Sequence, residues 1–500
     1  MNRLWRWCLF CVVLVSAAVS VAAEPNWPAF LAREDLIWTK IPETWEESAF
    51  IGNGNLGATI FAQDGMLAWE VNRADVYHAD SRYPMGRLAL RTAGKIAGGE
   101  LRLDLWNAEA HGTLRTDRGE VHWRSFTATT PSVIAIEFDG VGGEKDADFT
   151  WVPALARPPR STYRKQGFTP DELHPAAEVH PTADGLTSVQ RFLGGGAFAV
   201  VTKQAAAAGK KIIFLGVGRG DTAGAALADA QAVVEQAATL GLEKLTEAHR
   251  DWWHAYYPAS FLSIPDARLE AFYWIQVYKL GSAMRADGPV LDLMGPWFRR
   301  TPWPRIWWNL NAQLTYSPLF TANRLPLAES LFGALDRHRQ QLIDNVPPEL
   351  RADAAAIGRS SDQSLVSPIN LAEAKGDAGR EMGNLPWVMF LYWEYYRYQM
   401  DDAILRDRVL PLLSRTVGNY LAYVEKGSDG RYHLPPTFSP ELATVADCNY
   451  DLALLRWGLQ TLVASCEHLH LDDPRLPRWR EVLANLTPFP TDASGLMVGR

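Results

Sequence analysis

The sequence has few cysteines, and this scarcity excludes a fold built on disulfides. Only four cysteines occur among 500 residues, and two of them, Cys8 and Cys11, lie in the first 23 residues. If one helix carries the other two, Cys448 and Cys466, they lie about 27 Å apart and cannot bond. The cysteines also lack the paired spacing of a metal site. We therefore expect no disulfide framework, no metal and no other cofactor.

Apolar runs long enough to span a bilayer are also absent from the sequence that follows the first 23 residues. Residues 1–23 begin with Arg3 and Arg6, continue with an apolar stretch, and end with small residues before Glu24. This pattern is typical of a secretory signal peptide. We expect a secreted or periplasmic protein that does not insert into the membrane once the signal is removed.

An excess of positive charge is missing as well. The net charge is −8, and removal of the signal peptide takes away two arginines and no acid, which leaves −10. An acidic protein is a poor partner for nucleic acid or for an anionic membrane surface. The sequence therefore predicts no nucleic-acid partner.

The hydrophobic pattern changes once along the chain and predicts a multidomain β plus α protein. From 36 to 215, short alternating runs such as 56–61, 132–138 and 211–215 are separated by glycine-rich turns. Strands at this spacing predict an antiparallel β-sandwich over residues 24–220, with a long loop at 156–185. An alanine-rich helix over 223–248 predicts a helical linker over residues 221–262.

Helical patterns fill residues 263–500. The segments 269–280, 385–397, 404–424 and 450–469 are apolar on most faces, as in buried helices. Paired helices after a β-sandwich suggest an (α/α)6 toroid, which needs about a dozen helices. Six or seven are counted, so we expect residues 263–500 to form an incomplete barrel.

Two amides stand out in this region. Asn309 and Asn311 follow Trp307 and Trp308 directly. If the segment is extended, both amides point to the same side. Amides beside aromatic rings suit a neutral polyhydroxylated ligand, because an amide both donates and accepts hydrogen bonds. The alternative is a capping or turn asparagine beside two core tryptophans.

Several motifs, taken in order, resemble glycoside hydrolase family 95. They are Trp45–Phe61, Val71–Asp75, Asp266–Arg285, Trp308–Tyr316, Trp387–Met400 and Thr437–Glu441. The resemblance implies an inverting α-L-fucosidase with an N-terminal β-sandwich, a helical linker and an (α/α)6 barrel. It also implies an oligosaccharide or polysaccharide substrate.

The resemblance assigns roles to three residues. Glu441, in the Ser-Pro-Glu loop, would be the general acid, and Asn309 and Asn311 would hold the attacking water. An acid of this kind needs an apolar pocket that keeps it protonated, whereas the alternative is a loop carboxylate in water. The family takes its base from an aspartate in a later barrel loop. No matching motif follows Glu441, so we expect the 500-residue chain to lack the base and to be inactive without it.

Further candidates contact substrate in this interpretation. Trp307, Trp308 and Trp387 could stack on a sugar ring, although tryptophan is more often a core residue. Trp297 and Trp303 are further candidates of the same kind. Glu394 is either a ligand contact or a paired structural charge.

Three functions remain open on the sequence. The first is an exported inverting glycosidase acting on α-L-fucosides or related sugars such as α-L-galactosides. The second is another exo-glycosidase or a phosphorylase on the same architecture, and the third is a non-catalytic glycan-binding homologue. Arg73 and the Trp307–Trp308 pair depart from the family pattern, which leaves the substrate and the activity open.

Overall fold

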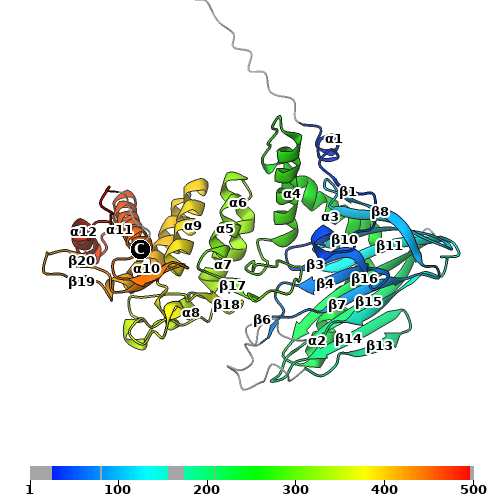
Figure 1. Cartoon of the computed structure of the whole chain (residues 1–500), viewed down its shortest axis with the longest axis horizontal. Coiled ribbons are helices and arrows are strands. Elements are labelled where there is room, and N and C mark those ends of the chain that lie inside the picture. Colours follow the sequence, from blue (N-terminus) through cyan, green and yellow to red (C-terminus); the bar gives the residue numbers. More distant parts are fainter. Residues whose placement is uncertain (1–24, 79–80, 156–173, 208, 496–500) are drawn as a thin grey trace, which may run out of the picture.

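The computed structural model describes residues 25–78, 81–155, 174–207 and 209–495. The predicted signal peptide and most of the predicted 156–185 loop lie outside the described residues. A β-sandwich forms one half of the molecule and helices form the other, with α4 nearest the sandwich and α12 farthest from it (Figure 1). The predicted β plus α organisation is confirmed.

The sandwich consists of two antiparallel sheets. The larger has the order β1 (Leu36–Trp38), β8 (Ile96–Asp104), β9 (Glu109–Thr116), β10 (Gly119–Ala128), β11 (Val133–Gly142), β16 (Lys210–Gly220), β15 (Ala197–Ala207), β14 (Gly185–Arg191) and β13 (Glu178–Thr182). The smaller has the order β12 (Asp148–Pro153), β7 (Gly86–Arg91), β4 (Met66–Arg73), β3 (Leu56–Gln63) and β2 (Ala49–Gly52). Strand β13 falls inside the segment predicted to be a loop. That prediction is wrong there, because pairing with β14 gives a strand to residues whose side chains are all exposed.

Aromatic side chains join the two sheets. Trp69 on β4 is fully buried and meets Trp123 on β10 edge to face, with ring centroids 4.9 Å apart. The Trp69 indole N–H also donates to Ser125 Oγ at 3.1 Å. A buried indole needs such an acceptor, so this pair fixes how the sheets stack.

Two helices follow the sandwich where one was predicted. They are α2 (Ala223–Leu240) and α3 (Leu242–Tyr256), and they are separated by Gly241, whose φ is +79°. A left-handed glycine ends a helix at low cost, which is why the alanine-rich run breaks there. Glycines in β16 let α2 pack closely, since a Cβ on Gly218 would lie 2.2 Å from the Ala226 carbonyl oxygen.

The second half contains both short and long helices. They are α4 (Ala267–Ala283), α5 (Asn311–Tyr316), α6 (Pro318–Thr321), α7 (Glu329–Arg337), α8 (Arg339–Asp344), α9 (Asn384–Gln399), the π-helix η7 (Ile404–Val409), α10 (Leu410–Leu421), α11 (Asn449–His468) and α12 (Leu476–Asn485). None of the described helices is long and apolar enough to cross a membrane.

Buried contacts hold the two halves together. Arg82, from the hairpin β5 (Tyr77–His78) and β6 (Ser81–Arg82), pairs with Asp292 of the helical half at 2.9 Å, and both side chains are almost completely buried. The Gly54 N–H donates to the Ser282 carbonyl at 2.8 Å. A Cβ on Gly54 would lie 2.7 Å from the Arg285 nitrogen, so only glycine allows this close approach.

Both described cysteines are free and buried on the same helix. Cys448 caps the start of α11, and Cys466 lies near its end. The prediction that they do not bond to each other is confirmed.

Candidate active site

A pocket of about 870 Å³ opens in the helical half, beside the first turns of α9 and α11. We call it the Asn–Trp pocket. It is lined by Leu293, Trp303, Trp307, Asn309, Leu310, Asn311, Arg359, Asp377, Trp387, Phe438, Ser439, Pro440, Glu441, Asn449, Tyr450, Ala453 and Leu454. The size is that of a ligand site for a small molecule.

The amide pair lies in this pocket, but not on an extended segment. The short strand β17 (Ile306–Trp307) pairs with β18 (Ser360–Ser361), the chain turns over 308–310, and α5 begins at Asn311. The expected extended geometry is therefore wrong. The turn nevertheless brings both amides to one pocket, with Asn309 only 7% exposed.

Adjacent tryptophans have opposite environments. Trp307 lines the pocket, whereas Trp308 is 0% exposed and its indole N–H donates to Ser361 Oγ at 2.9 Å. Because Trp308 is enclosed by the core, it cannot stack on a sugar, and its prediction as a substrate contact is corrected. Trp303 is half exposed in the pocket, and Trp297 is buried with its N–H on the Ile51 carbonyl.

Of the two substrate-contact candidates on helix α9, Trp387 and Glu394, only one lines the pocket. Trp387, in the first turn of the helix, lines the pocket and meets Tyr450 edge to face, with ring centroids 6.0 Å apart. Glu394 lies seven residues further on, about 10 Å along the helix axis. It is half-buried and is not among the pocket's residues. Its prediction as a substrate contact is corrected by its position along the helix.

Glu441 occupies the tip of a hairpin formed by β21 (Thr437–Ser439) and β22 (Ala443–Val445). Its φ is +60°, a left-handed conformation that a non-glycine residue adopts at a cost. The predicted apolar enclosure of its carboxyl is absent among the described residues, since the side chain is exposed.

Three contacts outside the tip hold this hairpin in place. The Arg359 guanidinium lies over the Phe438 ring at 5.5 Å, and Thr444 Oγ1 donates to Asp377 Oδ1 at 2.8 Å. The Arg380 guanidinium donates to the Pro436 carbonyl at 3.3 Å. The site therefore positions a carboxylate at the pocket mouth through its surroundings rather than through its own hydrogen bonds.

Sequence reasoning missed the polar residues that complete the pocket. Arg359 donates to the fully buried Glu381 through Nε at 2.8 Å, so its charge is balanced within the protein. Burial raises the pKa of Tyr450 well above its usual range, which keeps the phenol neutral. Arg359 lies in an irregular segment and Asp377 begins the short 3₁₀ helix η6 (Asp377–Arg380), so no long periodic pattern marks either of them.

A buried carboxyl directly follows the pocket residue Tyr450 in the chain. Asp451, next to Tyr450, accepts a hydrogen bond from Tyr420 Oη at 2.6 Å and is fully buried. Burial raises its pKa to about 6. Among the described residues, no group of three or more His, Cys, Asp or Glu side chains could hold a metal ion.

Solved structures share this architecture at low sequence identity. A protein described as a kojibiose phosphorylase from the human microbiome aligns with a TM-score of 0.61 and 10% identity, over 90% of this chain and 67% of the other. A bacterial glucoamylase complexed with acarbose aligns with a TM-score of 0.51 and 11% identity, over 90% and 69%. These likenesses confirm the predicted fold class.

Sequence comparison is more specific. Alpha-L-fucosidase 2 of Arabidopsis thaliana is 28% identical over 212 residues, which is 38% of this chain and 24% of the plant protein. The profile of the glycosyl hydrolase family 95 catalytic domain matches residues 232–498, more than half of the chain and all of the Asn–Trp pocket. The chain belongs to glycosyl hydrolase family 95.

Proposed function

We propose that this protein is an exported glycoside hydrolase that removes terminal α-L-fucosyl or related residues from glycans with inversion. Family membership and the plant relative named as a fucosidase support the substrate class. One observation carries the proposal. Asn309 and Asn311 line the same pocket as three tryptophans and as Glu441, which lies more than 100 residues further along the chain.

The proposed roles follow from the chemistry of inversion. An inverting glycosidase protonates the leaving oxygen on one side of the sugar and activates a water on the other, with the two groups about 6.5–9.5 Å apart. Glu441 protonates the leaving oxygen, and Asn309 and Asn311 orient the water. Trp303, Trp307 and Trp387 provide the flat apolar surfaces on which a sugar ring packs.

The base is assigned to none of the described residues. Two carboxylates line the pocket, Asp377 and Glu441. Asp377 Oδ1 accepts a hydrogen bond from Thr444, so we assign it to holding the hairpin. An amide is hardly basic, and a carboxylate must take the proton from the water. The family resemblance places that carboxylate in a later loop of the barrel.

Export is part of the proposal. Residues 1–23 have the order of a secretory signal, and the two described cysteines do not depend on a reducing compartment because they are buried and far apart. An extracellular or periplasmic location gives the enzyme access to glycans.

The test uses Glu441→Gln in the full-length protein, with Glu425→Gln as the control. Gln keeps the shape but has no transferable proton, so turnover on glycosides with poor leaving groups should fall roughly 10²–10⁴-fold. Activated aryl fucosides need less protonation and should lose less. Glu425 is exposed on another hairpin, and its side chain makes no hydrogen bond or ion pair with a described residue, so its variant should keep full turnover. Equal losses on both substrate types would exclude Glu441 as the acid.

A non-catalytic glycan-binding protein is the second candidate, and the exposure of Glu441 favours it. It predicts that the full-length protein binds fucosylated oligosaccharides and hydrolyses none of them. A phosphorylase has less support, since Arg359, the one cation lining the described pocket, is balanced by Glu381. Phosphate-dependent turnover would favour the phosphorylase over the glycan-binding protein.

A further inference from the structure

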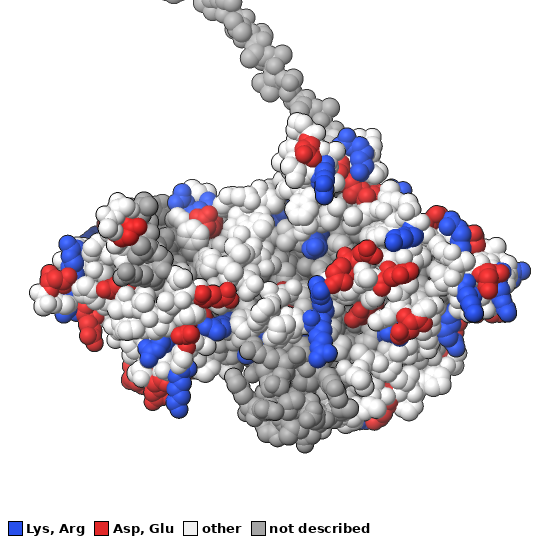
Figure 2. Space-filling view, in the orientation of Figure 1, with Lys and Arg blue, Asp and Glu red and all other residues white. Residues whose placement is uncertain are grey.

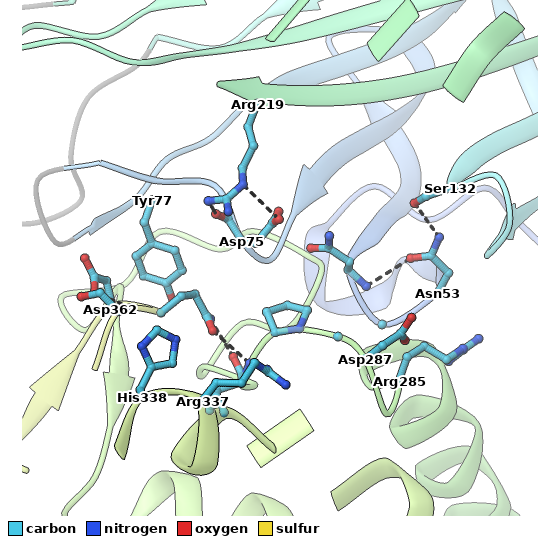
Figure 3. Close-up of a pocket in the computed structure, with 18 of the residues that line it drawn as sticks. Asn53, Asp75, Tyr77, Ser132, Arg219, Arg285, Asp287, Arg337, His338 and Asp362 are labelled. Atoms are coloured by element: carbon cyan, nitrogen blue, oxygen red, sulfur yellow. Dashed lines mark hydrogen bonds and ion pairs between the residues drawn. The ribbon is translucent and has the colours of Figure 1, made fainter. Parts of the chain in front are cut away.

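A second cavity lies between the sandwich and the helical half. It measures about 640 Å³, and we call it the junction pocket. Asp75, Tyr77 and Arg219 enter from the sandwich, and Asp287, Arg337, His338 and Asp362 from the helical half (Figure 3). The family's roles in the Asn–Trp pocket do not involve any of these residues.

The junction pocket is built on a rigid frame. Tyr77 Oη donates to Asp292 Oδ2 at 2.6 Å, and the same oxygen accepts from Arg82 at 2.9 Å. The Gln363 side-chain amide forms two hydrogen bonds with the Val290 backbone. It accepts from the Val290 N–H at 2.9 Å and donates to the Val290 carbonyl at 2.8 Å. The cavity is therefore preformed, as ligand sites usually are.

Several polar groups around the pocket still have hydrogen-bonding capacity. Among the described residues, neither the Asp287 carboxylate nor the His338 ring has a hydrogen-bond or ion-pair partner. The Arg219 guanidinium donates one hydrogen bond to the Asp75 backbone carbonyl at 3.0 Å, and the Arg219 side chain remains 55% exposed. Burial lowers the pKa of His338, so the ring is neutral near pH 7 and can both donate and accept.

The pocket is lined by both carboxylates and guanidinium groups, and this combination favours a neutral ligand over an anion or a cation. Asp287 and Asp362 would repel a phosphate or another anion, and Arg219 and Arg337 would repel a metal cation. Each hydroxyl of a sugar both donates and accepts, so it can satisfy carboxylates and guanidinium groups at once. The half-buried Tyr77 ring adds an apolar surface on the sandwich side.

The junction pocket and the Asn–Trp pocket have no lining residue in common. Val290 lines the first and Leu293 the second, while Gln363 and Arg359 have the same relation on the facing segment. Segments 290–293 and 359–363 thus contribute residues to both cavities.

We propose that the junction pocket is a second glycan site, which binds a neutral oligosaccharide through Asp287, Arg219 and His338. It would retain a glycan beside the Asn–Trp pocket without taking part in bond cleavage. The inference does not need the protein to be active, because it concerns binding alone.

The experiment measures how many molecules of 2′-fucosyllactose, a neutral trisaccharide, bind to full-length Glu441→Gln protein in equilibrium dialysis. This background slows any turnover during the measurement. We expect two sites. Adding Asp287→Ala and His338→Ala should weaken one of them about tenfold or more, as expected for the loss of two hydrogen bonds. Trp387→Ala should weaken only the other.

A second variant and a control guard against effects on folding. Ser364→Trp places a bulky ring at the exposed rim of the junction pocket and should remove the same site. Asp146→Ala combined with His180→Ala changes the same residue types at exposed positions of the sandwich and should keep both sites. Melting temperatures of all the variants are compared with that of the parent.

Each outcome decides the inference separately from the proposed function. One site that is lost only with Asp287→Ala and His338→Ala would support the junction pocket and count against sugar binding in the Asn–Trp pocket. One site that is lost only with Trp387→Ala would overturn the inference. Inorganic phosphate or Ca²⁺ binding at the junction pocket in place of the sugar would overturn it as well.

Discussion

Asp451 links the stability of the protein to pH. It is completely buried, and burial raises its pKa from 3.8 to about 6. The folded protein therefore keeps a proton that the unfolded chain has already released. This contribution is fully present below pH 3.8 and is lost as pH rises through about 6. The loss amounts to about 3 kcal/mol in the free energy of unfolding.

The measurement compares urea unfolding of the wild type and Asp451→Asn between pH 4 and pH 8. The asparagine side chain does not titrate, so the wild type should lose about 3 kcal/mol relative to the variant across this range. Parallel curves would show that Asp451 titrates normally in the folded state.

Neighbouring residues with the same side chain show a limit of sequence reasoning. Trp307 and Trp308 are equivalent in composition, yet one lines the pocket and the other is enclosed by the core. The difference arises because β17 pairs with β18, a strand that lies about 50 residues further along the chain. A local pattern carries no information about such a partner.

At the scale of single elements, the β2–β3 turn tests how closely the two halves approach. Gly54 in this turn and Gly65 in the β3–β4 turn both have positive φ, +91° and +76°, so alanine is strained at either position. Only Gly54 is crowded, with the Arg285 nitrogen 2.7 Å from a Cβ, whereas Gly65 has nothing within 4 Å.

We expect Gly65→Ala to lower the free energy of unfolding by about 1 kcal/mol and Gly54→Ala by about 2–4 kcal/mol, because overpacking adds to the strain. Urea denaturation of both variants gives the comparison. Equal losses would mean that the turn can move away from the helical half.

The hairpin that carries Glu441 should depend on Asp377. In Asp377→Ala, the hydrogen bond from Thr444 is lost and the hairpin is held less firmly. A displacement of about 1 Å in a catalytic group can cost up to 10²-fold, so turnover should fall about 10–100-fold with little change in melting temperature. Asp377→Asn keeps an acceptor oxygen and should restore most of the turnover. A loss in Asp377→Asn as large as in Asp377→Ala would point to a role for the carboxylate charge itself.

Elements with a strong period are the ones that the sequence predicts. The strands around 56–61, 132–138 and 211–215 and the helices around 269–280 and 450–469 form as expected. The exceptions have local physical causes. Gly241 splits the predicted 223–248 helix, and β13 forms through pairing although its own side chains are exposed.

At the scale of the whole molecule, the buried Arg82–Asp292 pair ties the sandwich to the helical half. Removal of one partner leaves a buried charge uncompensated, which costs about 3–5 kcal/mol. Arg82→Met should therefore lower the free energy of unfolding by about this amount.

The control is Arg91→Met, which removes a pair with Asp148 inside the sandwich that is largely exposed. Exposed pairs contribute about 0–1 kcal/mol. Chemical denaturation followed by circular dichroism compares the two variants. A loss below 1 kcal/mol in Arg82→Met would mean that the halves are joined mainly by apolar packing.

The candidate active site could be predicted only in part from the sequence. Asn309, Asn311, Trp387 and Glu441 belong to motifs that can be read in sequence, and they meet in one pocket. Arg359 lies in irregular chain and Asp377 in the short 3₁₀ helix η6, and only the fold brings them to the same pocket. The junction pocket combines loops from both halves, so it has no signature in either of them.

The two buried thiols of α11 make the opening of this helix measurable by chemical modification. Cys448 and Cys466 are 0% and 3% exposed, and burial raises the pKa of both thiols, which makes them poor nucleophiles. A thiol reagent can then react only during moments when α11 separates from its neighbours. The rate of modification in native buffer would thus time the opening of the helix whose first turn forms part of the Asn–Trp pocket.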